Sequence, residues 1–85
     1  MRIVSQDKEW DIPYKNAIIR RIDKDIYAYH PVLAGGSKKI AKYSNKNNAA
    51  KAMEMLQWQY HIIGERLVFE FPKDDEIRKN YENNQ

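Results

Sequence analysis

Residues 44–64, SNKNNAAKAMEMLQWQYHIIG, decide the fold of this chain. Ser44 and Asn45 favour the N-cap of a helix, and no Gly or Pro follows until Gly64, which favours the position just after a helix. The stretch therefore predicts one helix of about 19 residues. Apolar residues recur at helical spacing and predict one face that packs on a sheet: Ala49, Ala52, Met53, Leu56, Tyr60 and Ile63.

The same helix carries a second apolar face, formed by Met55, Trp58 and Ile62. A helix in a domain of this size cannot bury both of its sides, and a Trp side chain buries about 150–250 Å² when it is covered. Three arrangements follow: a homodimer or protein interface at these residues, cover by the C-terminal tail or by the hairpin that contains Trp10, or simple exposure.

Short β-prone segments surround the helix in the sequence, and turn residues separate them. Within residues 10–14 the apolar side chains alternate with Asp11 and Pro13, and Pro13 restricts this strand to an edge or an end. Pro72 stops the last strand. The predicted strands are residues 2–5, 10–14, 16–22, 26–30 and 38–43 before the helix and 67–71 after it.

The predicted fold class is α+β: an antiparallel β-meander of five to six short strands with one long helix packed on one face. Links between the first five strands are too short for parallel crossovers, which need about a dozen residues. We expect one domain over residues 1–72. Residues 73–85 are charged, with Ile77 and Tyr81 as their apolar side chains, and predict a flexible tail or one marginal helical turn.

Composition narrows the class of protein. The chain has 85 residues, 42% of them hydrophobic and 32% charged, which is typical of one small soluble domain. Its lack of cysteine rules out disulfides and zinc–thiolate sites. Because no apolar run approaches the roughly 18 residues of a membrane span, we expect a cytoplasmic protein without a membrane partner.

The net charge of +3 conceals a segregation along the chain. Between Pro13 and Lys51 there are nine Lys or Arg and two Asp, a net charge of +7, whereas the remaining residues carry a net charge of −4. Clustered cations attract phosphates of nucleic acids or nucleotides. A solvated lysine-rich face is the alternative interpretation.

The candidate anion-binding residues lie on the predicted central strands. Tyrosines are interleaved with them, as on sheets that stack bases, although β-propensity alone also favours Tyr on strands. Residues 35–39, GGSKK, lack the spacing of a phosphate-binding P-loop and predict a hairpin turn. The candidates are Arg20, Arg21, Lys38, Lys39 and Lys42, with Tyr14, Tyr27, Tyr29 and Tyr43 beside them.

No catalytic residue, metal site or cofactor is predicted. His30 and His61 lie at a strand end and on a helix flank, without the spacing of a catalytic triad or a metal motif.

Several short motifs resemble a family of small uncharacterised proteins encoded by phages and prophages of Firmicutes. They are MRIVSQD at residues 1–7, DIPY at 11–14, AKYS at 41–44, KAMEML at 51–56 and FEFPKDDE at 69–76. The family has no established catalytic residues, so the resemblance implies a setting, a phage accessory protein inside a bacterial host cell. Where relatives carry acidic residues in the first helical turn, this chain has Lys46-Asn47-Asn48.

Two functional hypotheses follow. The first is a non-enzymatic phage accessory protein that acts by binding, as a counter-defence inhibitor of a bacterial immune protein or of its nucleotide signal. The alternative is a small nucleic-acid-binding protein that uses the basic central strands. The expected partner is another protein or a second copy of the chain, with nucleotide or nucleic acid as the other candidate.

Overall fold

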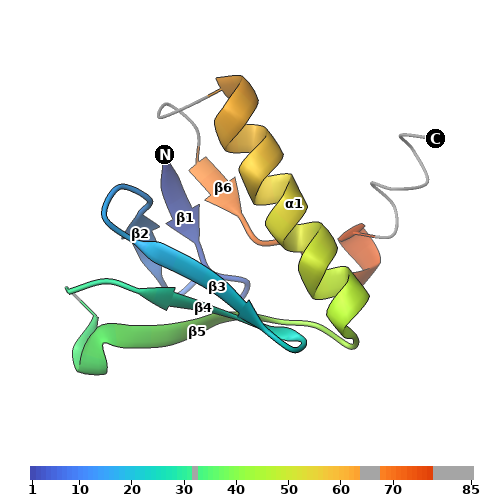
Figure 1. Cartoon of the computed structure of the whole chain (residues 1–85), viewed down its shortest axis with the longest axis horizontal. Helices are drawn as coiled ribbons and strands as arrows, with labels where there is room; N and C mark the ends of the chain where they lie inside the picture. The colour runs from blue at the N-terminus through green and yellow to red at the C-terminus, as the bar shows by residue number, and fades with distance from the viewer. Residues whose placement is uncertain (32, 64–67, 78–85) are drawn as a thin grey trace.

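The computed structural model describes residues 1–31, 33–63 and 68–77 and confirms an α+β fold (Figure 1). The predicted order, five strands, one helix and one strand, is also confirmed. The elements are β1 (Arg2–Val4), β2 (Asp11–Pro13), β3 (Ile18–Ile22), β4 (Asp25–Tyr29), a 3-10 turn (Ala34–Gly36), β5 (Ser37–Lys42), α1 (Lys46–Ile63) and β6 (Val68–Glu70).

The strands form two three-stranded sheets, in the orders β2-β1-β6 and β3-β4-β5. Of the five to six strands predicted to form an antiparallel meander, β3, β4 and β5 do so in one sheet. In the other sheet β2 is an edge strand, as Pro13 requires, and pairs antiparallel with β1. β6 pairs parallel with β1, and the connection between these two strands, which includes β2 to β5 and α1, is long enough for a crossover.

α1 begins where the N-cap pattern places it, since the Asn45 side chain accepts a hydrogen bond of 2.8 Å from the Asn48 N–H. Ala49, Ala52 and Leu56 are fully buried, as predicted, and α1 contacts β3 and β4. Tyr60 is a correction: it is 42% exposed and meets the Tyr14 ring edge-on at the surface. The side chain of Ile63, and Gly64, lie outside the described residues.

Both sheets, α1 and the segment after β6 contribute to a single core. Phe69 on β6 and Phe71 just after it are buried, as predicted, and Leu67 lies outside the described residues. The buried apolar side chains are Ile3, Ile12, Ile26, Ala28, Leu33, Ile40, Ala41, Tyr43, Ala49, Ala52, Leu56, Phe69, Phe71 and Ile77.

The first part of the predicted tail packs on the domain. Residues 74–77 form a helical turn beside the N-terminal half of α1 (Figure 1), and Ile77 is 1% exposed. The Asp74 carboxylate accepts hydrogen bonds from the Asn48 side chain at 2.8 Å and the Ser44 N–H at 3.2 Å. Asp74 thus supplies the negative charge that the first turn of α1 lacks. The domain extends to at least Ile77, past the boundary predicted at residue 72. The rest of the predicted tail, residues 78–85, lies outside the described residues.

Candidate functional site

One face of the β3-β4-β5 sheet points away from the core. On β4, Ile26 and Ala28 are buried, so the alternate residues Asp25, Tyr27 and Tyr29 lie on the opposite face. Directly paired residues of neighbouring strands share a face, which assigns their partners on β3 and β5 to the same side. We call this surface the outer face; it comprises Ile18, Arg20, Ile22, Asp25, Tyr27, Tyr29, Ser37, Lys39 and Lys42.

Tyr27 occupies the centre of the outer face. It pairs with Arg20 on β3 and with Lys39 on β5, so a cationic side chain lies on each side of its ring. The Lys39 Nζ is 5.9 Å from the centroid of that ring and 3.4 Å from a carboxylate oxygen of Asp25. Arg20, Tyr27 and Lys39, side by side across the three strands, therefore combine an aromatic surface with two positive charges.

Two of the three cations on the outer face lack a partner among the residues that the structure describes. Arg20 and Lys42 are exposed, and neither side chain makes an ion pair or hydrogen bond with any residue the structure describes. The third, Lys39, pairs with Asp25, the acidic residue of this face. The face consequently has a net positive charge that attracts anions.

A β-bulge places Lys39 and Lys42 on the same side. Residues three apart in a regular strand point to opposite faces. Here the register shifts between Ile26 and Tyr27, so that Ile40 and Ala41 together lie opposite Ile26 and both are buried. Lys42 then lies opposite Asp25 on the outer face.

Two predicted anion-binding residues lie on the other side of the sheet. Arg21 pairs with the buried Ile26, and its guanidinium donates a hydrogen bond of 2.7 Å to the Asp23 carbonyl. Lys38 pairs with the buried Ala28, and its Nζ lies 4.8 Å from the centroid of a Trp10 ring. Of the five candidates, the outer face brings together Arg20, Lys39 and Lys42.

Two of the four tyrosines are likewise elsewhere. Tyr43 is in the core, where its hydroxyl donates a hydrogen bond of 2.6 Å to the Pro72 carbonyl and burial raises its pKa. Tyr14 packs against Tyr60. Tyr27 and Tyr29 remain as the aromatic residues of the outer face.

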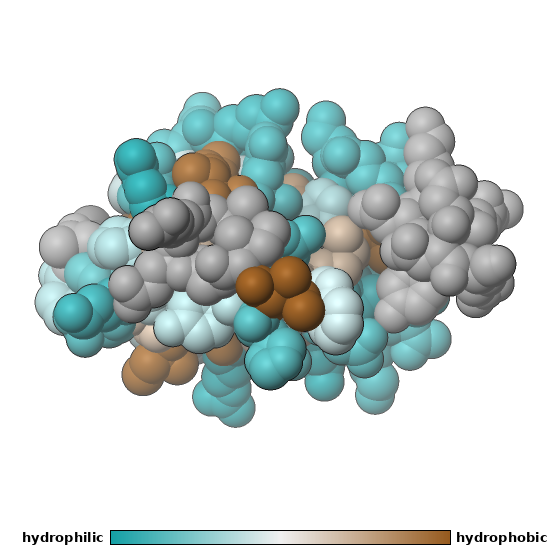
Figure 2. Space-filling view, turned by 90° about the horizontal axis from the view of Figure 1, so that it is seen from above, coloured by the Kyte–Doolittle hydropathy of each residue, from teal (hydrophilic) through white to brown (hydrophobic). Residues whose placement is uncertain are grey.

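The proposed protein-interface residues divide into two groups. Met55 is partly buried against the core, whereas Trp58 and Ile62 are 64% and 59% exposed. Trp58 lies beside the ring of His61, with centroids 6.5 Å apart. Seen from above, the apolar residues not hidden by grey atoms form separate small patches among hydrophilic ones (Figure 2).

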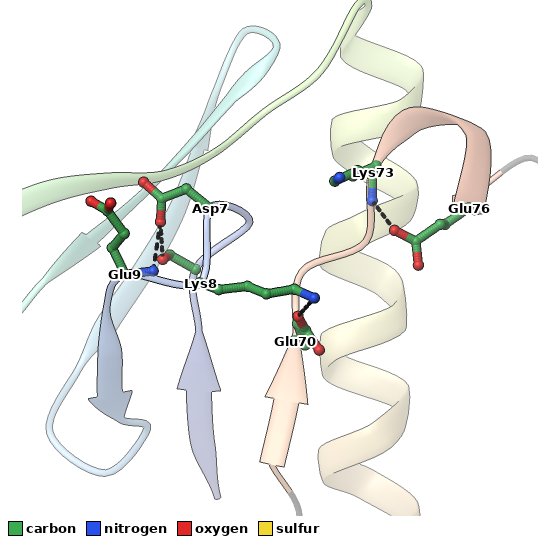
Figure 3. A network of polar contacts seen from close by, with 7 residues as sticks. Asp7, Lys8, Glu9, Glu70, Lys73 and Glu76 are labelled. Atoms are coloured by element: carbon green, nitrogen blue, oxygen red, sulfur yellow. Dashed lines mark hydrogen bonds and ion pairs between the residues drawn. The ribbon is translucent and has the colours of Figure 1, made fainter.

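A cleft of about 350 Å³ lies between β6 and α1. Its walls include Met55 and Val68, and four charged residues line it: Lys8, Glu70, Lys73 and Glu76. Lys8 reaches across to Glu70 at 3.2 Å, and Glu76 accepts a hydrogen bond from the Lys73 N–H (Figure 3). The first contact ties the β1–β2 loop to β6, and the second caps the helical turn at residues 74–77, so both have a structural role.

The Asp7 carboxylate also belongs to a local structural network. It accepts hydrogen bonds from the Ser5 hydroxyl and the Glu9 N–H, and these lower its pKa (Figure 3). Ser5 Oγ in turn accepts a hydrogen bond from the Trp10 N–H, which closes the β1–β2 loop. Residues 35–39 form the 3-10 turn and the start of β5, and Gly35 and Gly36 have φ values of 72° and 81°.

Within residues 1–31, 33–63 and 68–77, no three His, Cys, Asp or Glu side chains gather into a metal-binding group. In the same ranges, no helix has the length and apolarity needed to cross a bilayer. No protein-family model, curated protein or solved structure matches this chain.

Proposed function

We propose that this protein binds nucleic acid through the outer face of the β3-β4-β5 sheet. The observation that carries the proposal is the position of Tyr27 between Arg20 and Lys39 on an exposed sheet surface. Cations contact the phosphate backbone and aromatic rings contact bases, and a nucleic acid offers both groups at short intervals.

The pairing of charges favours this face over the cleft between β6 and α1. The carboxylates of Glu70 and Glu76 line the cleft, and a phosphate that enters must compete with Glu70 for Lys8. On the outer face Arg20 and Lys42 form no ion pair with a carboxylate among the described residues, so a phosphate need not displace one from either side chain.

A cytoplasmic phage accessory protein that acts by binding remains our prediction for the biological setting, and it rests on the resemblance of the sequence motifs. Inhibition of a bacterial immune protein and capture of its nucleotide signal are the two forms of that prediction. Capture of a nucleotide would use the same cations, so a mononucleotide that competes with an oligonucleotide would favour the signal-binding form.

The test uses two adjacent arginines on opposite faces. Arg20→Gln and Arg21→Gln remove the same charge, but the Arg20 side chain alone belongs to the outer face. We expect Arg20→Gln to weaken binding of a fluorescein-labelled DNA of about 20 nucleotides roughly fivefold and to reduce the dependence on salt, because one phosphate contact is lost. Arg21→Gln should change the affinity less than about twofold.

Fluorescence anisotropy at several salt concentrations gives the affinity for the DNA and its dependence on salt. Equal effects of the two variants would place the binding surface elsewhere. No binding even at low salt would exclude nucleic acid as the ligand.

A further inference from the structure

We infer that the nucleic acid is single-stranded and that two consecutive bases stack on Tyr27 and Tyr29. This inference rests on the proposed function and adds the class of nucleic acid and the way it is held.

The spacing of the two rings carries the argument. Tyr27 and Tyr29 are alternate residues of β4 on the same face, and residues two apart in a strand are about 6.6–6.8 Å apart. Bases in a continuous stack are about 3.4 Å apart, so two bases held by these rings must be separated from one another, as in an extended single strand.

The neighbouring strands supply what such a ligand needs around each ring. Strands are about 4.8 Å apart, so Arg20 and Lys39 are within reach of the phosphates on either side of a base on Tyr27. Beside Tyr29 are Ser37 and Ile18, which is 65% exposed and offers an apolar contact to a base or sugar.

The contact between Lys39 and Tyr27 does not block a base. The Lys39 Nζ is 5.9 Å from the ring centroid, and the side chain is about half exposed, with 46% of its surface accessible. An exposed cation–π contact is weaker than the stacking of a base on an aromatic ring. Lys39 therefore moves aside toward a phosphate when a base arrives.

A duplex cannot use the tyrosines in this way. Its base faces are covered by neighbouring base pairs, so a sheet surface meets only phosphates and groove edges. Duplex binding would depend on Arg20, Lys39 and Lys42 and would not depend on the tyrosine rings.

The experiment compares oligo(dT) of about 20 nucleotides with a duplex of the same length, using the whole chain. We expect the wild-type protein to bind the single strand at least about tenfold more tightly. Tyr27→Leu should weaken single-strand binding roughly tenfold and leave duplex binding within about twofold, whereas Tyr27→Phe, which keeps the ring, should retain the wild-type preference. Tyr29→Leu and Tyr29→Phe form a second matched pair.

Three results are distinguishable. Equal affinity for single strand and duplex, or a Tyr27→Leu variant that binds oligo(dT) like the wild type, would overturn the stacking inference while the proposed function stands. No binding to either DNA would overturn the proposed function itself. Because the wild-type ratio of the two affinities needs no variant, the inference is testable even if a substitution impairs folding, which circular dichroism would reveal.

Discussion

Gln6 and Lys42 are joined by a hydrogen bond of 3.0 Å, in which the Gln6 side-chain oxygen accepts the backbone N–H of Lys42. The Gln6 N–H also donates to the Ile40 carbonyl at 2.8 Å, and its side-chain amide donates to the Pro72 carbonyl at 3.1 Å. Gln6, in the loop after β1, thus ties β5, the strand that carries Lys39 and Lys42, to the first sheet and to the segment after β6. This connection fixes the candidate binding surface on the core.

We expect Gln6→Ala to lower the free energy of unfolding by about 1–3 kcal/mol, because the Lys42 N–H loses its partner and the Pro72 carbonyl keeps only the Tyr43 hydroxyl. Gln57→Ala is the matched control, since Gln57 is exposed on α1 and forms no hydrogen bond from its side chain among the described residues. Urea denaturation measures the free energy of unfolding of both variants. A Gln6→Ala variant as stable as the control would show that this side chain does not hold the sheets together.

Asp74 makes the stability of the protein depend on pH. Burial raises the pKa of its carboxyl, but the hydrogen bonds from Asn48 and Ser44 outweigh burial and bring the pKa below the ordinary value of 3.8. A carboxyl whose pKa is lower in the folded state stabilises the protein above the unfolded-state pKa and loses this contribution as the pH falls through the folded-state pKa.

The stability advantage of the wild type over Asp74→Asn should therefore be constant near neutral pH and shrink below about pH 4. Asp75→Asn serves as the control, because Asp75 forms no side-chain hydrogen bond or ion pair among the described residues. Thermal melts at a series of pH values provide the comparison. An advantage that persists undiminished to low pH would contradict the role assigned to the Asp74 carboxylate.

Leu56 and Ile62 test which face of α1 packs on the core. Leu56 is 1% exposed and Ile62 is 59% exposed. Leu56→Ala should cost about 2–5 kcal/mol of stability, whereas Ile62→Ala should cost less than about 1 kcal/mol. Similar melting temperatures for the two variants would show that the orientation of the helix is wrong.

Trp58 tests the predicted protein interface. Because the side chain is 64% exposed, we expect Trp58→Glu to change the stability of the folded chain by less than about 0.5 kcal/mol. If a second copy covers Trp58, light scattering should show a dimer for the wild type and a monomer for this variant. Unfolding of the variant would instead mean that Trp58 belongs to the core of the chain.

Local patterns in the sequence predicted most of the fold. The Asn45 cap depends on one side chain and the backbone three residues on. The buried positions on α1, Ala49, Ala52 and Leu56, and the buried Phe69 and Phe71 follow helix and strand periodicity, which nearby residues determine. The parallel pairing of β6 with β1 and the bond between Asp74 and Asn48 join residues far apart in the chain. Periodicity within one segment carries no information about such partners.

The candidate site was predictable only in part for the same reason. The sequence identified basic and aromatic residues on the central strands. It could not tell which member of each adjacent pair, Arg20 or Arg21 and Lys38 or Lys39, lies on the outer face, because that depends on the strand register. The adjacent apolar residues Ile40 and Ala41 are the one sequence signal of the bulge that brings Lys42 to the face of Lys39.

The most direct test of the binding surface is a titration of the isotopically labelled protein with oligo(dT), followed by NMR chemical shifts. Binding at the outer face predicts that the largest changes fall on residues of β3, β4 and β5, above all on Tyr27, Tyr29 and the side chain of Arg20. The amides around the cleft between β6 and α1 should change little. Changes centred on that cleft or on Trp58, or no change at saturating oligonucleotide, would contradict nucleic-acid binding by the β3-β4-β5 sheet.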